Sequence, residues 1–312
     1  HAGTPQLQAH TYLEHLGYTE KPNRDSGGHV ETPISEQDIE YAETYLAAGD
    51  ISTASQMLER YLELVEEYIA EECQATDEVQ YFSFQDSFER LCYARVEHDP
   101  RRIVAAPAPF DRLYSDVAYV CIQQQDYERA RDALIQAVRW NPMNCKYRLD
   151  LAEIFRALGD IQEWAALSNS VLERASDGRV AARAYSNLGQ LFIDQDNAVA
   201  ASGCARLAVR LAPADARTVA LMDRLAKEHP EVAKDSDDHV LGELSIQGIP
   251  TSPSADVAIC LLICASDAAA AGDRALAAEY TARANGLIGK EACSALIKMI
   301  READNEGGAD AQ

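Results

Sequence analysis

Residues 111–144, DRLYSDVAYVCIQQQDYERARDALIQAVRWNPMN, decide the fold. Two sets of large and small residues recur at helical spacing on either side of a polar turn at 125–127: Tyr114, Val117, Ala118 and Cys121, then Ala130, Leu134 and Ala137. Pro142 cannot continue a helix, so it ends the second one. The stretch predicts two helices that cross closely, with small residues where the backbones meet and large residues in the gaps.

The same pattern recurs along the chain. It is clear at 145–178 and at 182–215, and weaker at 35–68 and 258–291. The small residues Ala118, Ala152 and Gly189 lie almost one repeat length of about 34 residues apart, with three residues inserted before the third. Five units in phase indicate a repeat protein.

The spacing of large, small, aromatic and proline positions resembles the tetratricopeptide repeat signature over about two thirds of the chain. The resemblance implies an all-α fold, a right-handed superhelical solenoid of helix-turn-helix repeats. A last helix at about 291–303 would be a C-terminal capping helix for the open end of the stack. A plain helical bundle is the alternative fold.

The irregular stretches set the domain boundaries. We expect a poorly ordered arm at 1–33, with one short helix near His10–Gly17, and then a solenoid at 34–228 with an insertion at 74–110. A linker at 229–256 would separate two lobes. A C-terminal repeat with its capping helix would follow at 257–303, and then a disordered tail at 304–312. Within the insertion, the aromatic residues of 81–93 are predicted to lie on one helix and to belong to the core. The prolines at 100, 107 and 109 predict an extended segment after it.

The formal net charge of −23 argues against a nucleic-acid partner and against anionic membranes. Solubility alone also accounts for this acidity. The eight cysteines are scattered among apolar neighbours, as expected for reduced thiols in the core of a cytoplasmic protein. The chain opens with His1 rather than Met, which leaves a removed targeting segment open.

No motif of a known catalytic or cofactor site is visible. The sequence has no glycine-rich phosphate loop, no His-Glu-x-x-His and no paired Cys-x-x-Cys. Cys260 and Cys264 share a helix face, but packing in the core explains them better than a metal does. We therefore expect neither enzyme activity nor a cofactor or metal.

Three cations occupy the second position of successive units: Arg112, Lys146 and Arg183. A cation at the start of a helix opposes the helix dipole, so helix propensity does not explain them. The family resemblance implies that such first-helix positions line a concave groove, and the candidate groove residues are Arg112, Tyr119, Lys146, Arg156, Arg183, Asn187 and Gln190. Salt bridges to acidic neighbours in the stack are the alternative role for these cations.

The strip partly resembles the carboxylate clamp with which some tetratricopeptide domains hold chaperone C-termini. Arg183 and Asn187 match that clamp, whereas Ser115, Tyr119 and Asp150 depart from it. We therefore expect a cytoplasmic scaffold that binds a partner protein or peptide in its groove, without a chaperone being implied. A peptide-sensing regulator and an accessory subunit of an enzyme complex are the alternatives, and the oligomeric state stays open.

Overall fold

The computed structural model describes residues 32–307, with side chains through Met299. The predicted helix near His10–Gly17 and the last five residues lie outside this range. The described residues form two compact units, one up to Trp164 and the other from Ala165 on. The division falls inside a helix rather than at the predicted linker 229–256, because that stretch packs within the second unit.

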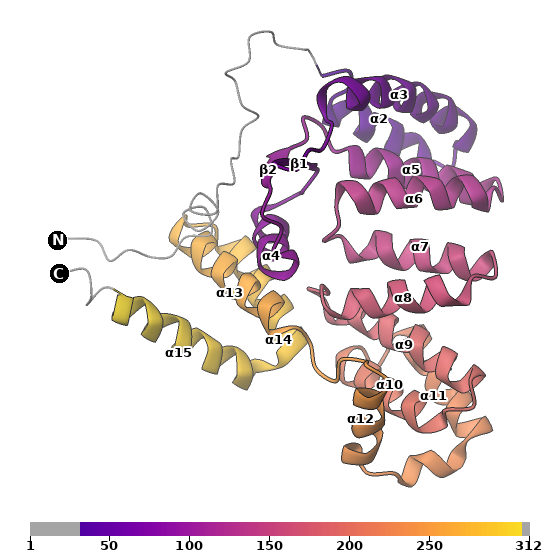
Figure 1. Cartoon of the computed structure of the whole chain (residues 1–312), viewed down its shortest axis with the longest axis vertical. Helices are drawn as coiled ribbons and strands as arrows, with labels where there is room; N and C mark the ends of the chain where they lie inside the picture. Colours follow the sequence, from indigo (N-terminus) through magenta and orange to yellow (C-terminus); the bar gives the residue numbers. More distant parts are fainter. Residues whose placement is uncertain (1–31, 308–312) are drawn as a thin grey trace. The chain divides into compact units, whose positions relative to one another are not determined.

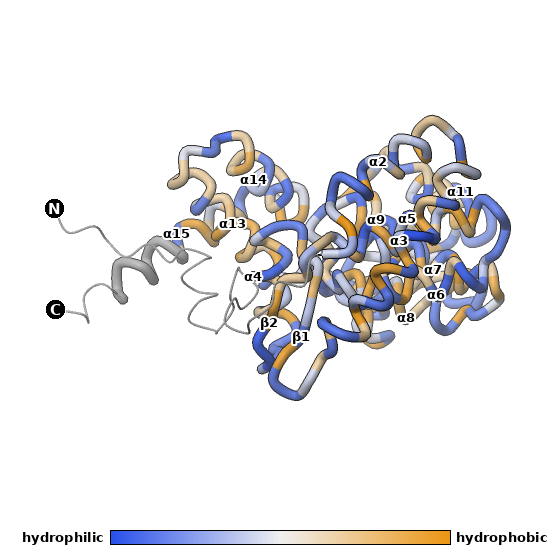
Figure 2. The backbone as a smooth tube through the Cα atoms, turned by 90° about the horizontal axis from the view of Figure 1, so that it is seen from above, coloured by the Kyte–Doolittle hydropathy of each residue, from blue (hydrophilic) through white to orange (hydrophobic). Residues whose placement is uncertain are grey.

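The first unit is a stack of helical hairpins with an insertion. Its elements are α2 (Glu36–Ala47), α3 (Ile51–Glu72), β1 (Val79–Phe82), α4 (Ser87–Glu97), β2 (Arg102–Ala105), α5 (Phe110–Gln123), α6 (Tyr127–Trp140), α7 (Cys145–Ala157) and the start of α8 (Ile161–Leu172). Figure 1 shows α5, α6 and α7 as successive layers, and each packs against the next. In Figure 2 hydrophobic and hydrophilic colours alternate within single helices, as amphipathic helices with one buried face require.

The second unit begins with the rest of α8 and continues with two hairpins and the helices between and after them. Its elements are α9 (Gly178–Asp194), α10 (Ala198–Leu211), α11 (Ala216–Glu228), the 3₁₀ helix η1 (Pro230–Lys234), α12 (Asp237–Ile246), α13 (Ala255–Ala270), α14 (Arg274–Ile288) and α15 (Lys290–Gly307). The helix α15 covers the predicted capping segment 291–303 and extends four residues beyond it.

The five predicted hairpins share one turn. Each turn has a residue in the left-handed conformation, with φ between 62° and 87°: Gly49, Gln125, Gly159, Asp196 and Gly272. The next residue donates its backbone N–H to a carbonyl five residues earlier, and its side chain accepts the N–H three residues later: Asp50, Asp126, Asp160, Asn197 and Asp273. The recurrence confirms the all-α repeat architecture.

Close packing depends on the predicted small residues. Ala118 and Ala152 are buried, and a Cβ atom at Gly189 would lie 2.5 Å from the Leu221 side chain. All eight cysteines are buried, which agrees with their predicted place in the core. Burial raises the pKa of the Cys73 thiol to about 11.

The insertion 74–110 differs from the prediction. Its aromatic residues do not share one helix, because Tyr81 and Phe82 lie on β1 whereas Phe88 and Tyr93 lie on α4. The strands β1 and β2 pair in parallel, with Val79 opposite Arg102 and Phe82 opposite Ala105. The core prediction is confirmed for Phe82, Phe88 and Tyr93, which are all less than 10% exposed.

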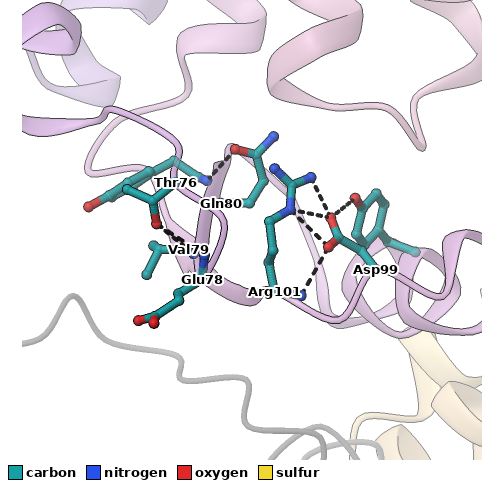
Figure 3. Close-up of polar contacts among 8 residues, drawn as sticks. Thr76, Glu78, Val79, Gln80, Asp99 and Arg101 are labelled. Carbon is teal, nitrogen blue, oxygen red and sulfur yellow. Dashed lines mark hydrogen bonds and ion pairs between the residues drawn. The ribbon is translucent and has the colours of Figure 1, made fainter.

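Two polar clusters hold the ends of this small sheet (Figure 3). The backbone N–H of Val79 donates to Thr76 Oγ1 at 3.0 Å, and Thr76 N donates back to the Val79 carbonyl. Before β2, Arg101 and Tyr93 both donate to Asp99, at 2.7 Å each. The Arg101 guanidinium is the main reason why the pKa of Asp99 falls to about 2.

The stretch 229–256 is also more structured than a linker. His229 ends α11 and Pro230 begins η1, but Ser236 then caps α12 by accepting the N–H of His239. The acidic run is not simply solvated, because Asp237 accepts hydrogen bonds from Arg206 and Arg210 at 2.7 Å each. With Val240 and Leu244 buried, α12 packs against α10.

Candidate partner-binding hollow

Two of the three predicted cations, Arg112 and Lys146, line one surface hollow of about 580 Å³ in the first unit. The starts of α5 and α7 carry them, and the start of α2 contributes Glu36. Asn144 and Tyr147 line it at the start of α7, and the remaining lining comes from the insertion, as residues 82–85 from the end of β1 and residues 105–109 from the end of β2. The hollow is therefore formed jointly by the repeats and the insertion.

The Arg112 side chain forms ion pairs with two carboxylates of α2. Its Nη2 lies 2.8 Å from Glu43 Oε2 and its Nη1 lies 2.8 Å from Glu36 Oε1. Each of these carboxylates already compensates part of the guanidinium charge. For this residue, the structure has the salt bridges that the sequence leaves as the alternative role.

Lys146 differs from Arg112. Its backbone N–H donates to Asn144 Oδ1, the cap of α7, whereas its side chain is exposed at the hollow. Among residues 32–299, no side chain forms an ion pair or hydrogen bond with its ammonium group. Lys146 therefore supplies the hollow with a positive charge that a ligand can meet.

The other predicted groove residues do not line this hollow. On α5, Tyr119 is 45% exposed, and on α7 the Arg156 guanidinium lies 4.9 Å from the Trp164 ring centre. Arg183, Asn187 and Gln190 belong to α9 in the second unit.

On α9, much of the face around the predicted residues is already covered. Asn187 is buried and donates to Ser168 Oγ at 3.1 Å, and Gln190 accepts from Arg224 at 2.7 Å. The Tyr185 hydroxyl donates to the Pro250 carbonyl at 2.8 Å, so the segment before α13 lies against this helix.

The hollow also contains aromatic residues that the sequence does not single out as ligand-binding. Phe82, Phe84 and Tyr147 line it together with Pro107 and Pro109. The aromatic and proline clusters are visible in the sequence, but their meeting depends on the pairing of β1 with β2. No local signal in the chain predicts that pairing.

Behind the hollow lies a buried polar network. Asn141 Nδ2 donates to Glu89 Oε2 at 2.9 Å and to Asp111 Oδ2 at 3.2 Å. The Tyr147 hydroxyl and Gln85 Nε2 also donate to Asp111 Oδ2, both at 3.3 Å. Burial raises the pKa of Glu89 to about 7 and also raises the pKa of Asp111.

Within residues 32–299, no group of three or more His, Cys, Asp or Glu side chains is placed to hold a metal ion. None of the helices in the described part of the chain combines the length and the apolar character needed to cross a bilayer.

The fold defines the chain as an all-α repeat protein built from helical hairpins. Residues 111–144, the α5–α6 hairpin, match the family model of the tetratricopeptide repeat. The α5–α6 hairpin is therefore similar in sequence to a tetratricopeptide repeat.

Other comparisons add little. A solved structure of pilF from Pseudomonas aeruginosa is similar, with 14% sequence identity and a TM-score of 0.43 over 80% of this chain and 89% of that chain. A TM-score this low does not establish a common fold. No curated protein sequence matches the chain.

Proposed function

We propose that the chain is a non-catalytic interaction scaffold that binds a peptide segment of a partner protein in the hollow beside Lys146. The observation that carries this proposal is the exposed Lys146 ammonium, which no side chain of residues 32–299 compensates, beside the aromatic lining of Phe82, Phe84 and Tyr147. A carboxylate on the peptide would meet the ammonium, and apolar side chains would pack on the partly exposed Phe84 ring.

The proposal narrows the predicted groove. Arg112 forms ion pairs with Glu36 and Glu43, and Asn187 is buried. These two residues therefore argue against all seven predicted groove residues forming one binding surface. Arg112 instead would shape the hollow by holding α2 against α5. The single recognition charge would then be Lys146.

The test uses an array of random synthetic ten-residue peptides with free C-termini, probed with the full chain. Peptides that bind are titrated by fluorescence anisotropy against wild type, Lys146→Ala and Lys146→Glu. We expect Lys146→Ala to weaken binding about five- to tenfold, since an exposed charge-assisted contact contributes about 1 kcal/mol, and Lys146→Glu to weaken it further.

The matched control is Lys227→Ala on α11, an exposed lysine in the second unit whose loss changes the net charge equally. It should leave the affinity unchanged within about twofold, because Lys227 does not line the hollow. Equal effects of the two alanine variants, or no peptide that depends on Lys146, would refute the proposed site.

A further inference from the structure

The backbone at the end of β2 carries free hydrogen-bonding groups at the hollow. Residues Ala105–Pro107 lie along its lining, where β2 ends at Ala105 and a bend begins at Pro107, with Ala105 partly exposed and Pro107 exposed. A strand edge of this kind presents N–H and C=O groups to which another extended chain can bond.

The ladder between β1 and β2 shows which groups face outward. Arg102 N donates to the Glu78 carbonyl and Ala106 N donates to the Phe82 carbonyl, both at 2.8 Å. In a parallel pair the residues that bond to the neighbouring strand alternate along the chain. The N–H and C=O of Ala105 therefore point away from β1, and neither bonds to any other described residue.

The free edge is short and one-sided. Ile103 is 2% exposed, so the outward edge of β2 is accessible only from Ala105 onward. The far edge of β1 is closed near its end, where Ser83 N donates to the Trp140 carbonyl of α6 at 2.8 Å. The accessible edge of β2 therefore offers room for a segment of about three residues, beginning opposite Ala105.

We propose that an extended peptide of a partner protein adds to this edge as a short third strand along Ala105–Pro107 and places a carboxylate on Lys146. The Ala105 N–H and C=O supply a two-bond pair, and the Lys146 ammonium supplies charge complementarity. Alternate peptide side chains face the partly exposed Phe84 in the same hollow. This binding mode rests on the proposed function and adds the geometry in which the peptide would bind.

The variant that tests the mode is Ala105→Pro. Proline removes the outward N–H but no ladder bond to β1, and Val104 before it is already extended, so the sheet should tolerate the change. Ala105→Val keeps the N–H and is the matched control. For a peptide that binds in a Lys146-dependent way, we expect at least tenfold weaker binding with Ala105→Pro and less than twofold change with Ala105→Val.

A second measurement uses the wild-type chain and so does not depend on the folding of a variant. Amide hydrogen exchange at Ala105 should slow at least tenfold when the peptide binds. N-methylation of single peptide residues should abolish binding at the one residue whose N–H donates to the Ala105 carbonyl and not at its two neighbours.

The outcomes separate the two proposals. Loss of affinity with Ala105→Pro, together with slowed exchange at Ala105, supports strand addition. Undiminished binding to Ala105→Pro with unchanged Ala105 exchange overturns strand addition, while Lys146 dependence in the same samples would keep the proposed function. Absence of any Lys146-dependent peptide overturns both.

Discussion

At the scale of single residues, the Asn141 amide joins the buried carboxyl group of Asp111 to the partly buried one of Glu89. It donates to both Glu89 and Asp111, and Gln85 N also donates to Glu89 Oε2, at 2.7 Å. These bonds favour the ionised form of Glu89, yet desolvation outweighs them and raises its pKa to about 7. The carboxylate is therefore destabilising at alkaline pH.

We predict that Glu89→Gln stabilises the folded chain by about 1 kcal/mol at pH 8 and by nothing at pH 5. The folded pKa of Glu89 lies above its unfolded value, so the stability it contributes is complete at low pH. That stability is lost as pH rises from about 4.5 through about 7. Urea unfolding at the two pH values measures the difference.

The control for this prediction is Glu63→Gln, which removes the same charge from an exposed position on α3. It should shift stability by less than 0.5 kcal/mol at either pH, as surface substitutions usually do. A Glu89→Gln protein that is less stable than wild type at pH 8 would show that the hydrogen bonds to the carboxylate outweigh its desolvation.

The individual site residues are only partly predictable from the sequence. The spacing of Arg112 and Lys146 correctly marks the starts of α5 and α7, and both residues reach one hollow. Arg112 is ion-paired and Lys146 is not, because Glu36 and Glu43 contact Arg112. These carboxylates lie about 70 residues before Arg112 in the chain and meet it only when α2 packs on α5. Burial of Asn187 likewise depends on its contact with Ser168.

At the scale of elements, the contact between α10 and α12 depends on Gly203. A Cβ atom at this position would lie 2.8 Å from the Val240 carbonyl oxygen and 2.8 Å from the Leu244 side chain. The Leu244 side chain can move, whereas the carbonyl belongs to the backbone of α12. The glycine therefore sets how closely the two helices approach.

We predict that Gly203→Ala destabilises the chain by about 1–3 kcal/mol, because the added methyl group overpacks a helix contact. Gly242→Ala on the exposed side of α12 is the matched control, with nothing within 4 Å of its added Cβ atom. It should stabilise by about 0.5–1 kcal/mol through helix propensity. Thermal unfolding followed by circular dichroism measures both, and equal effects of the two would contradict the role of Gly203.

Elements that repeat are predictable from the sequence, and those that occur once are not. The Gly-Asp pairs at 49–50, 159–160 and 272–273 mark turns that the structure has, because a left-handed residue and an N-cap have local signals. The strands β1 and β2 are four residues each and depend on pairing across α4. Helix α12 depends on Arg206 and Arg210 from α10, so its acidic start looks like a solvated loop in isolation.

At the scale of the whole molecule, charge is the dominant feature. The chain has 51 acidic and 28 basic residues, and the net charge of −23 repels itself in any compact state. Ion pairs such as Arg224–Asp194 and Arg129–Glu59 are largely exposed and each contributes less than about 1 kcal/mol. Long-range repulsion and local attraction therefore oppose each other across the surface.

The salt concentration decides whether the long-range repulsion or the local attraction has the larger effect on stability. The screening length falls from about 30 Å at 0.01 M to about 10 Å at 0.1 M salt, which removes long-range repulsion before it removes contacts at 3 Å. We predict that the melting temperature rises by a few degrees when NaCl is raised from 10 to 200 mM at pH 8. In the same range, peptide affinity at Lys146 should fall, since that contact joins opposite charges in solvent. Sucrose at equal osmolarity is the control for general solute effects and should not weaken peptide binding at Lys146. A melting temperature that falls with NaCl would mean that the surface ion pairs outweigh the repulsion among the excess carboxylates.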